Sequence, residues 1–304
     1  YRHLEVYFAT ACAGFVCHTI NPRLFPEQIE YIVGHAEDRW IFVDPAFVPM
    51  LEALKDRLGC VEGYVILGPA GSAANTSLRN AIDYETLIAG EADTFDWPEL
   101  DENSACTLCY TSGTTGNPKG VVYSHRALVP HTYGCLMPDV MNLSAREVVM
   151  PVVPMFHVNA WSMPYGAAVV GAKLVFPGPK MGDGEMLQRL IEGEGVTVTA
   201  GVPTVWLALL THLDRSGTGV PSLKRVIVGG SACPRAVMEA FEQKHGVHVH
   251  HAWGMTEMSP IGTFNSPSAD FDTLSPEEQW AQRLRVGRPV YGVEVKIVDA
   301  TGAE

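Results

Sequence analysis

The chain has 304 residues, of which 47% are hydrophobic and 18% are charged, and its formal net charge is −13. This composition is typical of a globular protein with one large domain or two small ones. No cluster of lysine and arginine is present, which argues against nucleic-acid binding because such a surface needs a basic face. Seven irregularly spaced cysteines favour reduced thiols in a cytoplasmic protein over a disulfide framework.

Membrane and targeting segments are not expected. No stretch reaches the roughly 18 to 20 unbroken apolar residues that a membrane span needs. The longest candidate, Val158–Ala172, is interrupted by polar residues, proline and glycine. No signal peptide is visible. The chain begins at Tyr1 inside a helical pattern and stops soon after a strand-like run, so we expect it to be part of a longer protein.

The first part of the chain alternates helical patterns with short apolar runs. Pro26, followed by apolar residues at helical spacing, predicts the start of a helix. Asp44 is placed to cap another helix, with Pro45 at its first position and Gly59 just beyond its end. The predicted elements are helix Tyr1–Ala13, helix Pro26–Ala36, strand Trp40–Val43, the helix between Pro45 and Gly59, strand Gly63–Leu67 and the small-residue loop Gly68–Ser77.

The later part repeats this alternation. Its predicted elements are strands Val121–Tyr123, Lys173–Phe176, Val196–Ala200 and Lys224–Val228, helices Glu185–Glu192 and Pro234–Lys244, and a surface loop with a short helix over Asp270–Gln282. Near the end, Val293–Val298 alternates apolar and polar residues and predicts a further, more antiparallel element. Strands rich in β-branched residues alternating with helices indicate an α/β fold with a largely parallel sheet.

The most informative segment is Tyr110–Gly120, which contains four Ser/Thr hydroxyls, three glycines and one lysine. Glycines let the backbone approach a ligand closely, and consecutive N–H groups can then form an anion-binding nest. Hydroxyls and Lys119 would add donors, which suits a triphosphate. The spacing is not that of a Walker A loop. The alternative is a flexible Gly/Thr turn without a ligand.

Ser112–Gly120 is similar to the signature loop of the adenylate-forming superfamily, which includes acyl-CoA synthetases, luciferases and peptide-synthetase adenylation domains. Three further segments resemble later motifs of that superfamily in the same order, namely Pro154–Val158, Val228–Pro234 and Trp253–Glu257. The resemblance therefore runs over essentially the whole chain.

Within the superfamily, Pro154–Trp161 and Ala200–Trp206 are most like bacterial medium- and long-chain fatty acyl-CoA synthetases and the related methylthio-alkanoate CoA ligases. His251–Pro260 leans toward the medium-chain and methylthio-alkanoate side. The resemblance implies an α/β fold: the large N-terminal domain of adenylate-forming enzymes, with sheets flanked by helices. It implies that residues 1–304 are part of this AMP-binding domain, incomplete at both ends and without the small C-terminal domain.

The implied function is an ATP- and Mg²⁺-dependent acyl-CoA synthetase that activates a medium- to long-chain fatty acid through an acyl-adenylate and transfers the acyl group to coenzyme A. Its partners would be the carboxylic acid, ATP and CoA, with no nucleic acid and with a homodimer as the candidate assembly. The alternatives are a methylthio-alkanoate CoA ligase and a non-catalytic nucleotide-binding fragment. The isolated chain is expected to be inactive, because the family's ribose-binding aspartate and adenylation lysine belong to later segments.

The resemblance also implies the site residues. Those assigned to catalysis are Lys119, His157, Thr256 and Glu257. Those assigned to the nucleotide are Thr111, Ser112, Gly113, Thr114, Thr115, Gly116, Lys119, Gly230, His251, Ala252, Trp253 and Thr256. Those assigned to the acid are His157, Val158, Trp161, Gly229 and Gly230. Thr111 and Glu257 are assigned to Mg²⁺, which prefers hard oxygen ligands and is typically held by one or two carboxylates plus phosphate oxygens.

Two groups of residues have simpler explanations. Four histidines lie between His245 and His251, but on a strand His248 and His250 share one face while His251 points away, so a zinc site is not expected. Cys106 and Cys109 form a C-x-x-C pattern. On a strand they lie on opposite faces, so we interpret them as small buried hydrophobic residues rather than a redox pair.

Overall fold

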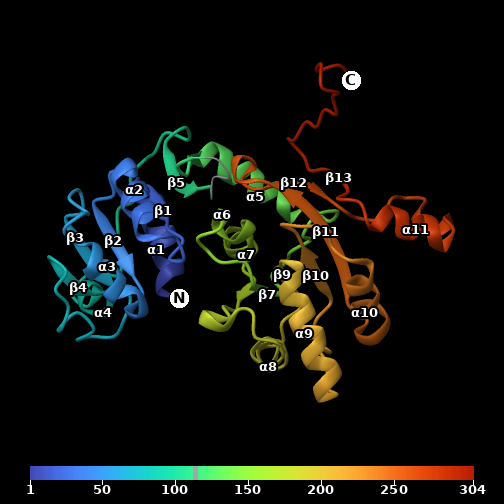
Figure 1. Cartoon of the computed structure of the whole chain (residues 1–304), viewed down its shortest axis with the longest axis horizontal. Coiled ribbons are helices and arrows are strands. Elements are labelled where there is room, and N and C mark those ends of the chain that lie inside the picture. Colours follow the sequence, from blue (N-terminus) through green and yellow to red (C-terminus); the bar gives the residue numbers. More distant parts are fainter. Residues whose placement is uncertain (112–115) are drawn as a thin grey trace. The chain divides into compact units, whose positions relative to one another are not determined.

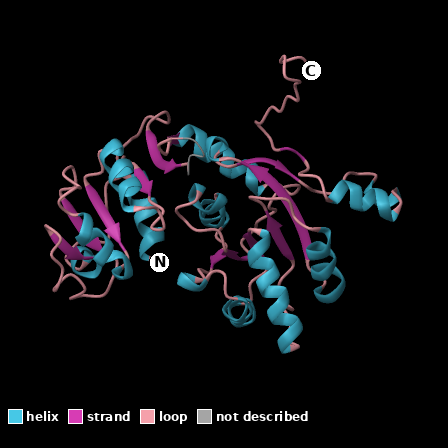
Figure 2. Cartoon of the chain, in the orientation of Figure 1, coloured by secondary structure: helices cyan, strands magenta, loops and turns pink. Residues whose placement is uncertain are grey.

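The computed structural model describes residues 1–111 and 116–304, and Ser112–Thr115 lie outside the described residues. The chain divides into two compact units, Tyr1–Arg126 (unit 1) and Ala127–Glu304 (unit 2). Each unit combines strands with helices, as Figures 1 and 2 show. Within the described residues, no helix is both long and apolar enough to cross a lipid bilayer.

Unit 1 holds two sheets of three strands each in its described part, with the orders β1-β5-β6 and β2-β3-β4. The second sheet is parallel throughout, whereas β5 and β6 form an antiparallel hairpin beside β1. The elements are α1 (Arg2–Cys12), β1 (Cys17–Thr19), α2 (Pro26–Ala36), β2 (Trp40–Val43), η1 (Pro45–Phe47), α3 (Val48–Leu54), β3 (Gly63–Ile66), β4 (Ala81–Asp83), α4 (Tyr84–Ile88), β5 (Ala105–Tyr110) and β6 (Gly120–Ser124).

The bounds of α2 and β2 agree with the prediction. Pro26 occupies the first turn of α2, and the Gln28 side chain accepts a hydrogen bond of 3.2 Å from the Phe25 N–H. The first N–H groups of a helix lack intrahelical partners. Proline removes one such N–H group, and the Gln28 side chain gives another an acceptor. The apolar face of α2 then packs into the core of unit 1 together with β2, α3 and β3.

The predicted helix between Pro45 and Gly59 is wrong in its bounds. Asp44 caps as expected, because its carboxylate accepts a hydrogen bond of 2.9 Å from the Ala46 N–H. The first turn is a 3-10 helix, η1, and α3 begins only at Val48 and ends at Leu54. Pro49, near the start of α3, has no N–H to donate, so the α-helical bond back to Pro45 cannot form.

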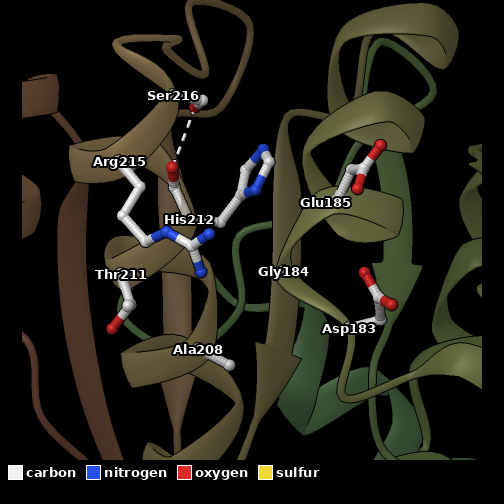
Figure 3. A pocket seen from close by; sticks show the side chains of 8 residues that line it. All are labelled: Asp183, Gly184, Glu185, Ala208, Thr211, His212, Arg215 and Ser216. Atoms are coloured by element: carbon white, nitrogen blue, oxygen red, sulfur yellow. Dashed lines mark hydrogen bonds between the residues drawn. The ribbon is translucent and has the colours of Figure 1, made fainter.

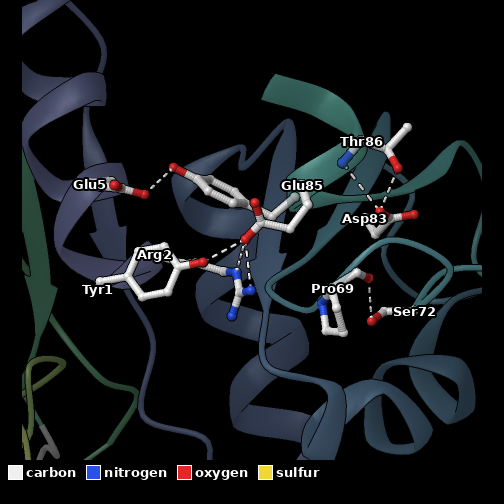
Figure 4. Close-up of polar contacts among 9 residues, drawn as sticks. Tyr1, Arg2, Glu5, Pro69, Ser72, Asp83, Glu85 and Thr86 are labelled. Carbon is white, nitrogen blue, oxygen red and sulfur yellow. Dashed lines mark hydrogen bonds and ion pairs between the residues drawn. The ribbon is translucent and has the colours of Figure 1, made fainter. Parts of the chain in front are cut away.

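Polar side chains join α1 to α4 in unit 1 (Figure 4). The Tyr84 hydroxyl donates a hydrogen bond of 2.8 Å to Glu5, and Arg2 forms an ion pair of 2.7 Å with Glu85. Asp83 caps α4 by accepting from the backbone N–H and the hydroxyl of Thr86. Burial raises the pKa of the Tyr84 phenol, which therefore stays a hydrogen-bond donor at neutral pH.

Unit 2 is built on a sheet whose strand order, within residues 127–304, is β13-β12-β11-β10-β9-β7-β8. The strands from β11 to β8 are parallel, which confirms the predicted fold class, and β12 and β13 are antiparallel additions. The helices and strands are α5 (His125–Leu136), β7 (Val148–Pro151), α6 (Val158–Trp161), α7 (Met163–Val170), β8 (Lys173–Leu174), η2 (Gly178–Lys180), α8 (Gly184–Glu194), β9 (Val198–Gly201), α9 (Pro203–Ser216), β10 (Arg225–Val228), α10 (Arg235–His245), β11 (His248–Gly254), η3 (Thr256–Met258), β12 (Ile261–Phe264), η4 (Phe271–Thr273), α11 (Pro276–Arg283) and β13 (Arg288–Pro289).

One core cluster of unit 2 packs α8, α9 and α10 against the parallel strands. Trp206 of α9 is fully buried and meets Phe241 of α10 edge to face, with ring centroids 6.3 Å apart. Close packing of α8 on α9 needs a glycine at position 184, because a Cβ there would lie 2.4 Å from the Ala208 carbonyl oxygen. This core fixes the ends of the parallel strands, where the predicted motifs lie.

The predicted strand over Val293–Val298 is wrong. The structure has no strand there, and Val295, Ile297 and Val298 are exposed. An alternating pattern forms a strand when a neighbouring strand supplies hydrogen bonds, and the nearest edge, β13, is a pair of residues only, Arg288–Pro289. The alternating pattern is present in the sequence, but this segment has no neighbouring strand to pair with within the described residues.

The interpretations of the histidines and cysteines are confirmed in geometry. His248 and His250 share one face of β11, with ring centroids 4.5 Å apart, whereas His251 is buried on the other face. Cys106 and Cys109 are both buried free thiols; the Cys106 thiol donates to the Tyr123 carbonyl, and Cys109 contacts the Thr19 hydroxyl. Burial raises the pKa of Cys106 to about 11, which keeps it unreactive.

Acidification should destabilise unit 2 through His250. Burial lowers the pKa of this imidazole from 6.5 to about 4. The unfolded chain therefore takes up the proton first, so the contribution to stability is present above pH 6.5 and is lost as pH falls from 6.5 to 4. We expect roughly 2 to 3 kcal/mol of loss between pH 7 and 4.5 from this group, measurable by urea unfolding.

The control for this prediction is His250→Asn. The asparagine amide can still donate to the Asn265 carbonyl, which His250 contacts at 2.9 Å, but it does not titrate. The variant should lose less stability than the parent protein on acidification. An identical pH dependence of unfolding in both proteins would show that His250 does not contribute to the loss of stability.

Candidate functional site

The predicted phosphate loop connects the two strands of the β5–β6 hairpin in unit 1. The Thr111 N–H donates a hydrogen bond of 2.9 Å to the Lys119 carbonyl, which closes the base of the loop. Gly116 has φ 89°, a left-handed conformation that glycine adopts without strain, and Lys119 is exposed. The remaining predicted loop residues, Ser112, Gly113, Thr114 and Thr115, lie outside the described residues.

Polar contacts brace the foot of this loop. The Tyr110 hydroxyl lies 2.7 Å from the His35 Nδ1, and the His18 ring is 5.0 Å from the Tyr110 ring. His18 in turn pairs with Asp38, with an Nδ1–Oδ2 distance of 2.7 Å. These contacts orient the residue directly before Thr111. Sequence reasoning did not single out His18, His35 or Asp38, because their partners lie far away along the chain.

The predicted acid-side segment contains an uncommon backbone conformation. Five consecutive residues, Val158–Ser162, have φ values of 46°, 53°, 50°, 56° and 60°, so the chain makes a left-handed turn here (labelled α6 in Figure 1). Each L-residue in this region costs about 1–2 kcal/mol, and a β-branched residue such as Val158 is especially rare there. Such strain persists only where the surrounding structure imposes it, and it concentrates at functional sites.

Packing and hydrogen bonds impose the left-handed turn. Its five side chains are all buried, with Ala160 at 0% exposure. The Ser162 hydroxyl donates a hydrogen bond of 2.9 Å to the Ser259 carbonyl, next to η3. The Gly166 N–H donates to the Ser162 carbonyl at 2.9 Å, which starts α7 directly behind the turn. The predicted residues Val158 and Trp161 are therefore held by a rigid frame.

Replacing Ala160 by glycine provides a test of this strain. Glycine in an ordinary helix costs about 1 kcal/mol relative to alanine. At Ala160 the same change also relieves the left-handed penalty of about 1–2 kcal/mol. The matched change is Ala240→Gly, inside right-handed α10. The loss of unfolding free energy caused by Ala160→Gly should therefore be smaller than the loss caused by Ala240→Gly, by at least about 1 kcal/mol. Equal losses, measured by denaturant unfolding, would contradict a strained turn.

Three of the predicted site residues meet at the end of β10. A Cβ at Gly229 would lie 2.9 Å from the Trp161 ring and 3.3 Å from the Ala252 carbonyl oxygen, so these three residues pack closely. Gly230 has φ 79° and lies beside Val202, which is exposed. Glycine at position 229 is thus what lets the indole and β11 approach each other. The acid-side and adenine-side assignments converge on one place in unit 2.

The segment after β11 presents an aromatic face and a carboxylate. Trp253 is 42% exposed, and its ring packs over Gly262, where a Cβ would lie 2.8 Å from it. Gly254 is equally tight, since a Cβ there would lie 2.1 Å from the Pro260 carbonyl oxygen. Because these two positions carry no side chain, β11 and β12 can pack closely together. Glu257 in η3 is exposed.

Two histidines add polar groups. His251 is buried, and within the described residues its Nδ1 has no hydrogen-bond partner, so it can accept or donate a bond to a ligand. His157 precedes the left-handed turn and stays exposed, while the surrounding protein lowers the pKa of its imidazole by desolvation. A neutral imidazole beside a carboxylate acts through hydrogen bonds rather than charge. Both positions fit their predicted roles, which remain predictions.

The predicted magnesium ligands have suitable chemistry. The Thr111 hydroxyl and the Glu257 carboxylate are hard oxygen donors, and two protein ligands leave room for the phosphate oxygens and waters that Mg²⁺ usually keeps. Thr111 belongs to unit 1 and Glu257 to unit 2. No group of three or more His, Cys, Asp or Glu side chains within the described residues could hold a metal alone. The assignment of Mg²⁺ to Thr111 and Glu257 stays a prediction.

A surface hollow between α8 and α9 is a different feature (Figure 3). Asp183 and Glu185 lie on one side of it, and His212 and Arg215 on the other. The acidic groups at α8 and the basic groups of α9 face the same solvated space. None of the predicted site residues lines the hollow. We therefore regard this hollow as solvated surface between two packed helices.

The whole chain matches one family of known proteins. The family model, described as "AMP-binding enzyme", covers residues 1–304. The chain belongs to this AMP-binding enzyme family. A solved structure, an anthranilate CoA ligase AuaEII in complex with anthranoyl-AMP, has a TM-score of 0.83 at 24% identity, covering 98% of this chain and 54% of that one. At that identity the likeness shows the fold alone, and it confirms the predicted α/β fold of adenylate-forming enzymes.

Two curated relatives are equally similar in sequence. A medium-chain-fatty-acid–CoA ligase of Ectopseudomonas oleovorans is 53% identical over 301 residues, 99% of this chain and 55% of the relative. A 3-methylmercaptopropionyl-CoA ligase of Ruegeria lacuscaerulensis is 53% identical over 302 residues, 99% of this chain and 56% of the relative. The chain spans about half the length of the curated relatives it matches.

Sequence reasoning missed part of this AMP-binding enzyme's candidate site. Ser162 and Ser259 tie the left-handed turn to the segment after η3. Ser162 lies just outside the Pro154–Trp161 segment, and Ser259 lies inside His251–Pro260 but was assigned no role. Their only sequence signal is proximity: Ser162 follows Trp161, and Ser259 follows Glu257 by two positions. The structure shows that the two motifs are joined to each other by these flanking residues.

Proposed function

We propose that the full-length protein is an ATP- and Mg²⁺-dependent acyl-CoA synthetase that activates a medium- to long-chain fatty acid and transfers it to CoA. The observation that carries this proposal is the close packing of Trp161, Gly229 and Ala252 beside a strained turn. The family model matches this chain from residue 1 to residue 304. Identity of 53% to a medium-chain-fatty-acid–CoA ligase supports the acid class. On this proposal units 1 and 2 are parts of one AMP-binding domain.

The proposed reaction has two steps. A carboxylate oxygen of the acid attacks the α-phosphorus of ATP, an acyl–phosphate bond forms, and pyrophosphate leaves. The thiol of CoA then loses its proton and attacks the acyl carbon, and AMP leaves. Charge spreads over phosphate oxygens in the first transition state, so positioned donors and cations lower its energy.

The predicted site residues would share the work as follows. Lys119 and the loop from Thr111 to Gly116 would bind the β- and γ-phosphates through a cation, hydroxyls and backbone N–H groups. The exposed face of Trp253 would stack on adenine, with His251, Ala252 and Gly230 beside it. Thr256 would hold the α-phosphate. Mg²⁺, bound by Thr111 and Glu257, would neutralise the phosphate charge.

The acid would lie against the left-handed turn. His157 would hold the carboxylate as a neutral hydrogen-bond donor, since the pKa of its imidazole is lowered. Val158, Trp161, Gly229 and Gly230 would provide an apolar boundary for the tail. Such a boundary gains roughly 0.8 kcal/mol for each CH₂ that it buries, so it favours acids with an apolar tail.

A second candidate is a methylthio-alkanoate CoA ligase. The equal identity of 53% to a 3-methylmercaptopropionyl-CoA ligase favours it to the same degree. The two candidates differ in the acid, since a thioether tail is short and slightly polar whereas a fatty acid tail is longer and apolar. A non-catalytic nucleotide-binding protein is the candidate from another class.

Exchange of labelled pyrophosphate into ATP tests these candidates on the full-length protein. The panel contains straight-chain acids of four to sixteen carbons, 3-(methylthio)propionate and a control without acid. Exchange and CoA-thioester formation that rise with tail length would support the fatty acid synthetase, and a maximum at 3-(methylthio)propionate would favour the second candidate. Nucleotide binding without acid-dependent exchange for any acid would overturn both.

We also propose that the protein is cytoplasmic and forms a homodimer. All seven cysteines are free in the structure, which supports a reducing compartment. Cell fractionation and sedimentation analysis of the full-length protein would test these two points, and a disulfide-linked, exported or strictly monomeric protein would contradict them.

A further inference from the structure

A partly buried histidine outside all the recognised motifs contacts residues that flank two of them. His131 lies on α5, where its Nε2 is 3.1 Å from the Ile261 N–H, just beyond the Thr256–Glu257 motif. Its Nδ1 is 3.3 Å from the hydroxyl of Ser162, the last residue of the left-handed turn. Ser162 in turn donates to the Ser259 carbonyl at 2.9 Å. One side chain therefore connects the acid-side turn with the segment that follows η3.

These contacts define where the protons are. The backbone N–H of Ile261 is a donor, so His131 Nε2 must be the unprotonated nitrogen that accepts. The ring proton is then on Nδ1 and is donated to the Ser162 oxygen, while the Ser162 proton goes to the Ser259 carbonyl. Each of these three donors has one acceptor. Burial lowers the pKa of His131 to about 4, so the ring keeps this neutral form at physiological pH.

The frame behind His131 is rigid. Cys135, one helical turn further along α5, places its sulfur 3.6 and 3.7 Å from the two ring nitrogens. Cys135 is itself buried, and so is Ser162. The turn that His131 holds has little freedom, because its left-handed residues exist only under the constraint of their neighbours. A displacement of the turn would therefore move or break the hydrogen bonds at Ile261 and Ser259.

We infer that His131 is a positioning residue that couples binding of the acid at the left-handed turn to binding of the nucleotide at the Thr256–Glu257 motif. This inference rests on the proposed function and deepens it. The bond to Ser162 holds the acid side, and the bond to Ile261 holds the nucleotide side. Either ligand, by ordering its own side, then prepares the other side through the imidazole. Coupling of this kind is reciprocal, so each ligand tightens the other by the same factor.

Titration calorimetry on the full-length protein measures this factor directly. The nucleotide probe is Mg²⁺ with α,β-methylene-ATP, whose bridge between the α- and β-phosphorus is not cleaved, and the acid is octanoate. The nucleotide Kd is measured with and without saturating octanoate. In the parent protein we expect the acid to lower the Kd by about fivefold or more, the usual lower range of such coupling.

Three variants test the two bonds of His131, and a fourth variant is the control. His131→Leu removes both, His131→Asn keeps a donor near the Nδ1 position toward Ser162, and His131→Gln keeps an acceptor near the Nε2 position toward Ile261. The matched control is Thr132→Val, which removes a buried hydroxyl bonded to the Leu128 carbonyl on the same helix and leaves His131 intact.

Coupling needs both bonds, so all three His131 variants should reduce the coupling factor to about one, whereas the Kd of each ligand alone stays within about threefold. Thr132→Val should keep the parent factor. The inference is overturned if the His131 variants keep the parent coupling, or if both Kd values rise together with coupling unchanged, as a purely structural role predicts. A parent protein without acid-dependent exchange overturns the proposed function, whereas exchange without coupling overturns this inference alone.

Discussion

Replacing Glu257 by glutamine should slow acid-dependent pyrophosphate exchange by about 10²- to 10³-fold, the loss expected when one preorganised group that stabilises transition-state charge is removed. Glu257 is exposed in η3, and within the described residues its carboxylate has no hydrogen bond or ion pair. Its charge is therefore available to a metal. Glutamine keeps the shape and one oxygen but loses the charge that makes the side chain a strong Mg²⁺ ligand.

The measurement is exchange as a function of Mg²⁺ concentration in the full-length protein, with urea unfolding in parallel. Stability should change by less than about 0.5 kcal/mol, as is usual for exposed positions. The control is Glu239→Gln, which removes the same charge from unit 2 at a surface ion pair with Arg235. It should leave the exchange rate unchanged. Parent-like turnover of Glu257→Gln at low Mg²⁺ would refute the metal assignment.

Replacing Trp161 by alanine should flatten the preference for long acids. Trp161 is 6% exposed and packs on Gly229 at the end of the left-handed turn, so its indole borders the proposed acid site. Each buried CH₂ contributes roughly 0.8 kcal/mol, or about fourfold in kcat/KM, as long as the tail has an apolar surface to cover. An indole that shields the carboxylate until a tail displaces it makes tail length a condition for opening as well as for binding. Without the indole, short acids should lose little and long acids should lose most of their advantage.

The measurement is kcat/KM across straight-chain acids for the full-length parent and variant. Trp206→Phe is the matched control, because Trp206 is an equally buried indole that packs in the core and donates to the Gly201 carbonyl at 3.1 Å. That control should lower thermal stability and shift every acid by one common factor. If Trp161→Ala also changes kcat/KM of every acid by one common factor, Trp161 is a packing residue and does not select acids by tail length.

Local signals predicted the elements that depend on few residues. The bounds of α2 follow from Pro26 and a regular apolar face, and Gly246 ends α10 in the left-handed conformation that glycine favours. Prediction failed where a partner or a second proline decided the outcome. Pro49 divides the helix after Asp44, and Val293–Val298 has alternating residues but no neighbouring strand within the described residues.

The candidate site was predicted by motif, and its geometry was not. Nothing in the letters Val-Asn-Ala-Trp-Ser predicts a left-handed turn, since asparagine alone among these residues tolerates that region. The turn results from packing against Gly229 and from hydrogen bonds to residues about a hundred positions later. His131 gave no sequence signal either, because its partners Ser162 and Ile261 are 31 and 130 positions away.

The left-handed turn also bears on the order in which the protein folds. A short isolated peptide of this sequence would prefer right-handed conformations, so the turn cannot nucleate folding and must wait until the strands around Gly229 and Ala252 are in place. We therefore expect its contacts to form after the folding transition state, so that substitutions within it mainly accelerate unfolding. A nascent chain would then complete its sheet first and form the turn that we propose borders the acid last, so the final folding intermediate would have a complete sheet but no acid site.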